Sequence, residues 1–128
     1  MIGVDIIKVD RVVKLANIDK NNKVFTKKEI EYANTKSNKK TITEECSQRD
    51  NTLAGMFNTK EAFLKALGFG LGDKFALNEI EVGHKQSGEP YIVITKKIKD
   101  YLREIKKTQV NLSISHDAGI SIAVVEVI

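Results

Sequence analysis

The first residues of the chain alternate between apolar and polar side chains. In the segment IGVDII, residues 2–7, this alternation places Ile2, Val4 and Ile6 on one face and Asp5 on the other. Alternation with a period of two, together with β-branched residues, is typical of a strand that is buried on one side only. We therefore expect a half-buried strand whose apolar face carries the three aliphatic residues.

The second half of the chain predicts further strands. Residues 110–128 alternate again and are interrupted by the turn-forming residues 116–119, which predicts a C-terminal hairpin. The segments 78–83 and 90–95 are rich in β-forming residues and flank a turn that contains Gly88. Hairpin-linked strands beside several helices indicate the α+β class with an antiparallel sheet rather than a doubly wound parallel sheet.

Helix signals lie between these strands. Asp10 is placed to cap a short helix, and Thr26 followed by Glu29 has the spacing of a capping box at the start of a second helix. Residues 96–107 predict a basic amphipathic helix, and the polar residues 35–51 predict a mobile surface loop.

A third helix is predicted from about residue 51 to residue 67, ended by Gly68 in a left-handed cap. At 100° per residue, Lys60 falls in the middle of its apolar stripe, Glu61 at the edge, and Lys65 one turn further on. One interpretation is a surface Glu61–Lys65 pair with Lys60 extending to solvent. The other is a site, because buried charges require partners.

Composition limits the class of protein. The chain has 128 residues, 41% hydrophobic and 30% charged, which suits a single domain over 1–128. One cysteine, Cys46, and no basic, apolar leader favour a cytoplasmic location. No apolar run approaches the ~20 residues that span a bilayer, so no membrane association is expected. The net charge of +4 favours an anionic partner, while 6% aromatic residues offer little for stacking single-stranded bases.

Asp5 and Glu61 are hard oxygen donors that suit Mg²⁺ shared with substrate phosphates better than zinc. Asp5 also fits a simpler role as a turn former. Cys46 and His116 are too few for a zinc site, but His116 fits a general base, a phosphate ligand or a solvated turn residue.

Four segments carry a resemblance to a known family: IGVDIIKVDR, FNTKEAFLKALGFG, SGEP and SISH, in this order. Together they resemble holo-acyl-carrier-protein synthase, the short type of 4′-phosphopantetheinyl transferase, over nearly the whole chain. The resemblance implies that family's α+β fold and transfer of 4′-phosphopantetheine from coenzyme A to a serine of apo acyl carrier protein. It also implies release of adenosine 3′,5′-bisphosphate, a role in fatty acid biosynthesis, dependence on Mg²⁺, and a homotrimer with active sites at the subunit interfaces.

The resemblance also implies roles for individual residues. Asp5 and Glu61 match the two carboxylates that hold Mg²⁺ with the pyrophosphate, so both are expected to be catalytic. Lys60 and Lys65 match the lysines that place positive charge at the phosphates of coenzyme A, and Lys65 is also expected to act in catalysis. His116 matches a histidine near the phosphates, as a ligand or a catalytic group.

Further residues are expected around the substrates. Gly68 matches the glycine that closes the helix motif, and Gly88 and Pro90 match the turn on the adenine side of coenzyme A. Arg11 matches an arginine that contacts the acidic carrier protein, and the neighbouring cations Lys14 and Lys28 are expected to take part in the same docking.

The chain departs from the family pattern at four positions. Met56 stands where family members commonly have Arg, Asn58 and Thr59 stand where small apolar residues are common, and Asp117 replaces a Thr or Ser. We expect these departures to affect the binding of the 3′-phosphate of coenzyme A. The proton of the serine hydroxyl has two candidate acceptors, His116 and a water in the Mg²⁺ shell.

Two other functions are consistent with parts of the sequence. A basic nucleic-acid-binding module would explain the charge excess but not the two carboxylates. A catalytically silent subunit that binds the carrier protein would retain Arg11 without activity.

Overall fold

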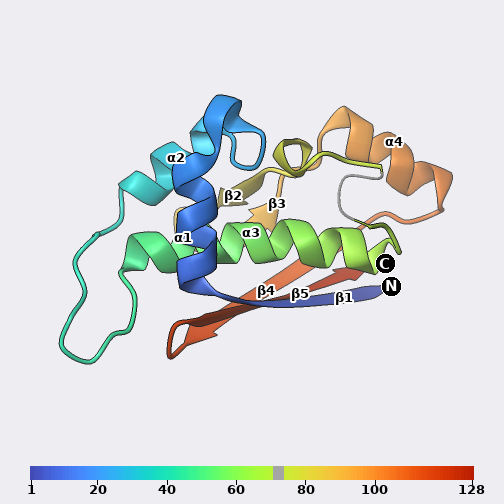
Figure 1. The fold of residues 1–128 in the computed structure, drawn as a ribbon. Coiled ribbons are helices and arrows are strands. Elements are labelled where there is room, and N and C mark those ends of the chain that lie inside the picture. The colour runs from blue at the N-terminus through green and yellow to red at the C-terminus, as the bar shows by residue number, and fades with distance from the viewer. Residues whose placement is uncertain (71–73) are drawn as a thin grey trace.

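A three-stranded antiparallel sheet forms the base of the molecule (Figure 1). The computed structural model describes residues 1–70 and 74–128. The strands β1 (Ile2–Lys8), β5 (Ile120–Val127) and β4 (Val110–Asp117) lie in the order β1-β5-β4, so β1 is an edge strand. Ala118 and Gly119 join β4 to β5 with positive φ angles of 50° and 77°, as a two-residue hairpin turn requires. The predicted C-terminal hairpin is confirmed.

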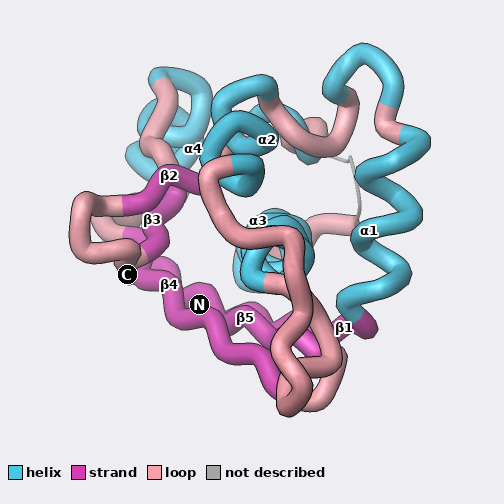
Figure 2. The backbone as a smooth tube through the Cα atoms, turned by 90° about the vertical axis from the view of Figure 1, so that its left-hand side faces the viewer, coloured by secondary structure: helices cyan, strands magenta, loops and turns pink. Residues whose placement is uncertain are grey.

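The helix α3 (Gln48–Ala66) lies across one face of this sheet (Figures 1 and 2). Gly3 permits the close approach, because a Cβ atom there would collide with the backbone of Ala62 and Ala66. The remaining elements surround α3 on its other sides. They are α1 (Val9–Ile18), η1 (Lys20–Asn22), α2 (Lys27–Asn34), η2 (Leu77–Glu79), β2 (Val82–His84), β3 (Pro90–Ile92) and α4 (Lys96–Glu104).

Two apolar clusters hold α3 in place. The first joins its C-terminal half to the sheet, β3 and α4, around Phe63 and Phe75. The second joins its N-terminal half to α1 and α2, around Phe25 and Met56. α3 is therefore the central element of a single α+β domain, and the predicted fold class is confirmed.

The prediction for β1 was wrong about which face is buried. Ile2, Val4 and Ile6 are 65%, 46% and 63% exposed, whereas Gly3 and Asp5 face α3. Alternation separates the two faces of a strand but does not decide which one a helix covers. The close contact of α3 at Gly3 decides it here, and it leaves an aliphatic sheet face uncovered.

Helix ends differ from the prediction in detail. The capping box is confirmed, because Thr26 accepts from the Glu29 amide at 3.2 Å and Glu29 accepts from the Thr26 amide at 2.9 Å. Asp10 is not a cap; it lies in the first turn of α1, which follows Lys8 without a side-chain cap. Ser47 caps α3, so residues 48–51 are helical rather than part of the loop.

The strands of the β2–β3 hairpin are three residues each and therefore shorter than predicted, and α4 ends at Glu104. Within the described part of the chain, none of the helices has the length and apolar character needed to cross a membrane.

Candidate functional site

Asp5 lies on the inner face of the edge strand β1, against α3. Its Oδ1 accepts a hydrogen bond from Lys65 Nζ at 3.1 Å, and its Oδ2 accepts one from Asn58 Nδ2 at 2.5 Å. The Asp5 side chain is 12% exposed, whereas that of Lys65 is 54% exposed. Asp5 is therefore a mostly buried carboxylate with one buried and one solvent-accessible partner.

Glu61 completes this cluster from α3, one turn before Lys65. Its side chain is partly buried, and burial together with the negative charge of Asp5 raises the pKa of Glu61, while Lys65 lowers it. Two carboxylates that repel one another beside a single exposed ammonium are suited to receive an added cation. The structure thus brings together Asp5, Glu61 and Lys65, three of the residues that the resemblance implies for the site, and their roles stay predictions.

The donor set fits Mg²⁺. Both side chains offer hard carboxylate oxygens, and Mg²⁺ in phosphate-handling sites often takes only one or two protein carboxylates, with phosphates and water as its other ligands. Among the described residues there is no group of three or more His, Cys, Asp or Glu side chains suited to a metal. Asp5 and Glu61 could together supply two of the oxygen ligands of such an ion.

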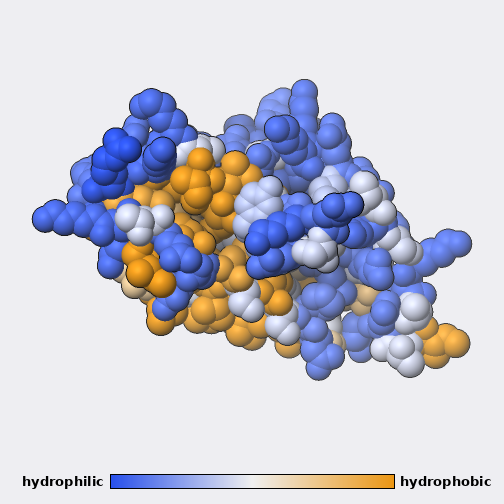
Figure 3. Space-filling model, turned by 180° about the vertical axis from the view of Figure 1, so that it is seen from behind, coloured by the Kyte–Doolittle hydropathy of each residue, from blue (hydrophilic) through white to orange (hydrophobic). Residues whose placement is uncertain are grey.

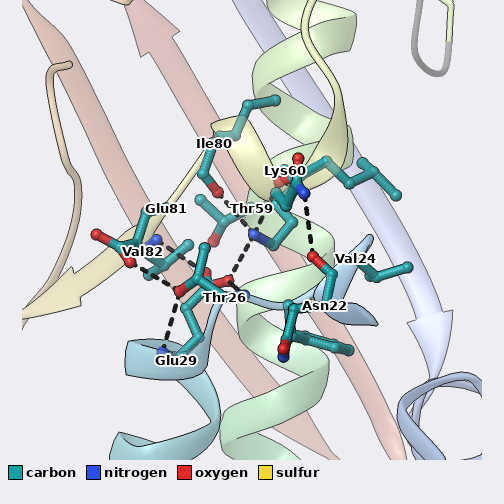
Figure 4. A network of polar contacts seen from close by, with 12 residues as sticks. Asn22, Val24, Thr26, Glu29, Thr59, Lys60, Ile80, Glu81 and Val82 are labelled. Carbon is teal, nitrogen blue, oxygen red and sulfur yellow. Dashed lines mark hydrogen bonds and ion pairs between the residues drawn. The ribbon is translucent and has the colours of Figure 1, made fainter. Parts of the chain in front are cut away.

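Lys60 does not belong to this cluster, and the expectation that it contacts coenzyme A is corrected by the structure. It is fully buried, and its ammonium points toward Glu29 of α2 (Figure 4). Its Nζ donates to Glu29 Oε1 at 2.8 Å, to Leu77 O at 3.0 Å and to Ile80 O at 2.7 Å. All three N–H groups are occupied, so none is free for a phosphate.

Burial lowers the pKa of Lys60, while the carboxylate of Glu29 acts in the opposite direction. Glu29 in turn accepts from the amides of Thr26 and Val82 (Figure 4). This buried pair fastens α2, α3 and the start of the β2–β3 hairpin to one another, which is a structural role.

A second region lies beside the N-terminal half of α3. His116, Gly88 and Pro90 line a cavity of about 460 Å³ together with residues of α2 and α3. In its wall the rings of Tyr32 and His84 stack at 3.9 Å with an interplanar angle of 7°. This stacked pair cannot be predicted from the sequence, because no local pattern relates residues 52 positions apart.

The two regions are separate within one chain. Asp5 on β1 pairs with Ala123 on β5, and Ala123 pairs with Ile114 on β4. His116 lies two residues beyond Ile114 on the same strand. Two strand spacings alone place Asp5 and His116 about 10 Å apart. For the described residues, no hydrogen bond or ion pair joins the Asp5 cluster to the cavity.

The remaining predicted residues belong neither to the Asp5 cluster nor to the lining of the cavity. Gly68 has φ 79° and donates to Lys65 O at 3.0 Å, which identifies it as the residue that ends α3. Arg11, Lys14 and Lys28 are exposed on α1 and α2. Met56, at the position where the family commonly has Arg, is a fully buried core residue.

Asn58 is a residue of the site whose role the sequence did not reveal. In the sequence it stands out only as a departure from the family pattern, yet its side chain contacts Asp5 directly. Its position three residues before Glu61 on α3 is the one sequence signal that would have placed it beside the carboxylates.

Comparison with known proteins identifies the family of this chain. The family model for the 4′-phosphopantetheinyl transferase superfamily matches residues 1–125, so the chain belongs to that superfamily. Its relatives include the holo-[acyl-carrier-protein] synthases of Fusobacterium nucleatum and Halothermothrix orenii. The first is 36% identical, covering 90% of this chain and 87% of the relative, and the second is 37% identical, covering 97% and 93%.

Solved structures of related proteins are similar to nearly the whole of this chain. The Helicobacter pylori holo-[acyl-carrier-protein] synthase in complex with coenzyme A has a TM-score of 0.78 and 30% identity, covering 99% of both chains. A holo-(acyl-carrier-protein) synthase from Bacillus anthracis in complex with CoA (3′,5′-ADP) has a TM-score of 0.72 and 29% identity, covering 98% of this chain and 92% of that one.

Proposed function

We propose that this protein is a holo-acyl-carrier-protein synthase that acts in fatty acid biosynthesis. It transfers 4′-phosphopantetheine from coenzyme A to a serine of apo acyl carrier protein and releases adenosine 3′,5′-bisphosphate. The observation that carries the proposal is the Asp5–Glu61–Lys65 cluster, in a chain that aligns over 99% of its length with a relative solved with coenzyme A.

We further propose that Asp5 and Glu61 hold Mg²⁺, which when bound neutralises charge on the pyrophosphate of coenzyme A. Lys65 contributes positive charge from the same helix, because its exposed side chain can leave Asp5 and reach a phosphate oxygen. The reaction displaces the bisphosphate at phosphorus: a bond from the serine oxygen forms and the bond to the leaving phosphate breaks. The serine proton passes to a base.

The cavity that contains His116 is the proposed nucleotide region. Gly88 and Pro90 form its edge, and the exposed His116 is placed on its wall to accept a proton or to bind a phosphate oxygen. The large nucleotide of coenzyme A requires both this cavity and the Asp5 cluster, which one chain keeps on different sides of β5.

We propose that a homotrimer joins the two regions, with the cavity of one subunit beside the Asp5 cluster of the next. The proposal is supported by the uncovered sheet face. Apolar surface extends along the lower side of the molecule, where the sheet lies (Figure 3). Its residues with large exposed fractions are Ile2, Val4, Ile6, Ile120 and Val124. Aliphatic patches of this kind mark interfaces, and cyclic closure gives equivalent sites.

Complementation tests the shared site. The Glu61→Ala protein is mixed with a separately inactive variant of the Gly88–Pro90 turn, and the two are allowed to exchange subunits. Partial recovery of activity is expected. A monomer in sedimentation, or no recovery despite demonstrated exchange, would contradict the shared site without contradicting the transfer reaction.

We propose that the acidic carrier protein docks on α1 and α2 through Arg11, Lys14 and Lys28. All three side chains are exposed, and the chain carries a net charge of +4. Complementary charge would accelerate the encounter and orient the carrier. The free Cys46 supports action in the reducing cytoplasm.

The proposed reaction is tested by incubating the protein with coenzyme A, Mg²⁺ and an apo carrier protein and measuring the intact mass of the carrier. A gain of one phosphopantetheine is expected. Carrier binding without a mass gain would identify a catalytically silent binding subunit. Salt-sensitive binding to random DNA without transfer would instead identify a nucleic-acid-binding module.

A further inference from the structure

Asn58 is a polar residue in the fully buried part of α3. Its exposed fraction is 0%, and its Nδ2 donates to Oδ2 of Asp5 at 2.5 Å. Its Oδ1 is also buried, and within the described chain this oxygen has no hydrogen-bond partner. A buried acceptor without a partner is unfavourable, so what the asparagine contributes here is the hydrogen bond from its Nδ2 to the Asp5 carboxylate.

The contact with Asp5 fixes the orientation of the amide. If the amide were turned over, its oxygen would face the carboxylate oxygen, and two acceptors would repel. The N–H therefore faces Asp5, and the unpaired oxygen on the other side is a consequence of that arrangement.

The two oxygens of Asp5 consequently have partners of different kinds. Oδ2 is held by the amide of Asn58, which is fully buried and packed in the helix. Oδ1 is paired with the ammonium of Lys65, whose side chain is 54% exposed and free to move to another anion. Asn58 is therefore a fixed partner of Asp5, whereas Lys65 is an exchangeable one.

We propose that Asn58 is a positioning residue that fixes the plane of the Asp5 carboxylate so that Oδ1 is the oxygen presented to a divalent cation. This inference rests on the proposed metal-dependent transfer. Asn58 acts through Asp5 and need not touch the substrate. Hydrogen bonds behind a metal ligand orient it, and their loss typically weakens metal binding by about 10- to 100-fold.

The adjacent residue offers a matched control. Thr59 is also fully buried in α3, but its hydroxyl donates to Gly55 O at 2.7 Å within the helix and does not contact Asp5. Thr59→Ala and Asn58→Ala each remove one polar group from neighbouring buried positions. Asn58→Leu is a second test variant that keeps the side-chain volume and removes the donor.

The experiment measures Mn²⁺ binding to each full-length variant by the loss of the free-ion paramagnetic resonance signal, with urea unfolding in parallel. We expect Asn58→Ala and Asn58→Leu to bind Mn²⁺ at least about tenfold more weakly. Thr59→Ala should bind it as the unchanged protein does. The unfolding midpoints of the Asn58 variants should be lower, because Oδ2 of Asp5 loses its donor, so Mn²⁺ binding is measured without urea, where circular dichroism shows each variant to be folded.

Mn²⁺ affinity within twofold of the unchanged protein in both Asn58 variants would overturn the proposal, as would an equal loss in Thr59→Ala. If the unchanged protein binds Mn²⁺ and the Asn58 variants do not, but no phosphopantetheine is transferred, the proposed function fails and the positioning role stands. If the unchanged protein binds no Mn²⁺, the positioning role is wrong.

Discussion

On α3, Lys60 precedes Glu61 and Lys65 follows it by one turn. Replacing Lys60 by methionine should mainly lower the stability of the protein, whereas replacing Lys65 should mainly weaken the binding of coenzyme A. Lys60 is 0% exposed and its ammonium has three protein acceptors, whereas Lys65 is 54% exposed and pairs only with Asp5 among the described residues. Lys60→Met leaves the buried carboxylate of Glu29 without its counterion. Removal of one partner of a buried pair costs about 3–5 kcal/mol, a large part of the roughly 5–15 kcal/mol that stabilises a domain.

These free energies correspond to measurable shifts in Tm. A chain of 128 residues unfolds with an entropy of about 0.27 kcal/mol/K, so Lys60→Met should lower Tm by about 11–19 °C. Lys65→Met removes a surface ion pair worth about 0–1 kcal/mol and should lower Tm by less than about 4 °C. Affinity for coenzyme A should show the reverse order, with Lys65→Met weakened and Lys60→Met unchanged at temperatures where it is folded.

Thermal unfolding followed by circular dichroism gives the first quantity, and calorimetric titration with coenzyme A gives the second. The double variant Lys60→Met with Glu29→Gln is the control, because it removes the unpaired charge and should recover part of the lost stability. A loss of less than about 1 kcal/mol in Lys60→Met, or a selective loss of coenzyme A affinity in it, would refute the structural role of this lysine.

Three other substitutions have defined outcomes. Because the folded pKa of Glu61 is raised by burial and by Asp5, its stabilising effect is complete below about pH 4.5 and is lost as pH rises through the folded value. Glu61→Gln should therefore be more stable than the unchanged protein at pH 7.5 but not at pH 4, as urea midpoints at the two pH values will measure; a pH-independent difference would contradict this. Burial and Lys36 lower the pKa of His84, so its stabilising effect is present above about pH 6.5 and lost as pH falls through the folded value. The unchanged protein should lose more stability than His84→Gln between pH 7.5 and pH 5 in the same assay, and parallel losses would exclude His84 as the cause. Arg11→Glu should raise KM for the carrier protein on the order of tenfold, equivalent to about 1.4 kcal/mol, and leave KM for coenzyme A unchanged in steady-state kinetics; equal effects on both would argue against a separate docking contact.

Short-range features of this protein could be predicted from its sequence. The capping box of Thr26 and Glu29 and the hairpin turn at Ala118 and Gly119 depend on residues a few positions apart, and both are present. The helical spacing also placed Lys60 among buried residues, although α3 is buried on most of its sides and not along one apolar stripe.

Long-range partners could not be predicted in this way. Glu29 lies 31 residues from Lys60, and Asn58 lies 53 residues from Asp5, so the helix pattern alone does not reveal either contact. The face of β1 that α3 covers is likewise decided by the absence of a side chain at Gly3, which alternation does not report. Local periodicity predicts elements, whereas the roles of buried polar residues depend on how those elements pack.

The central claim is that Asp5 and Glu61 together support a metal-dependent transfer of phosphopantetheine. The most direct test is the initial rate of mass gain of an apo carrier protein, measured against Mg²⁺ concentration for the unchanged protein, Asp5→Asn and Glu61→Gln. We predict saturable dependence on Mg²⁺ in the unchanged protein, loss of at least about a hundredfold in rate in each variant, and folded variants by circular dichroism. Transfer at the same rate in either variant, or transfer unaffected by complete removal of divalent cations, would contradict the account.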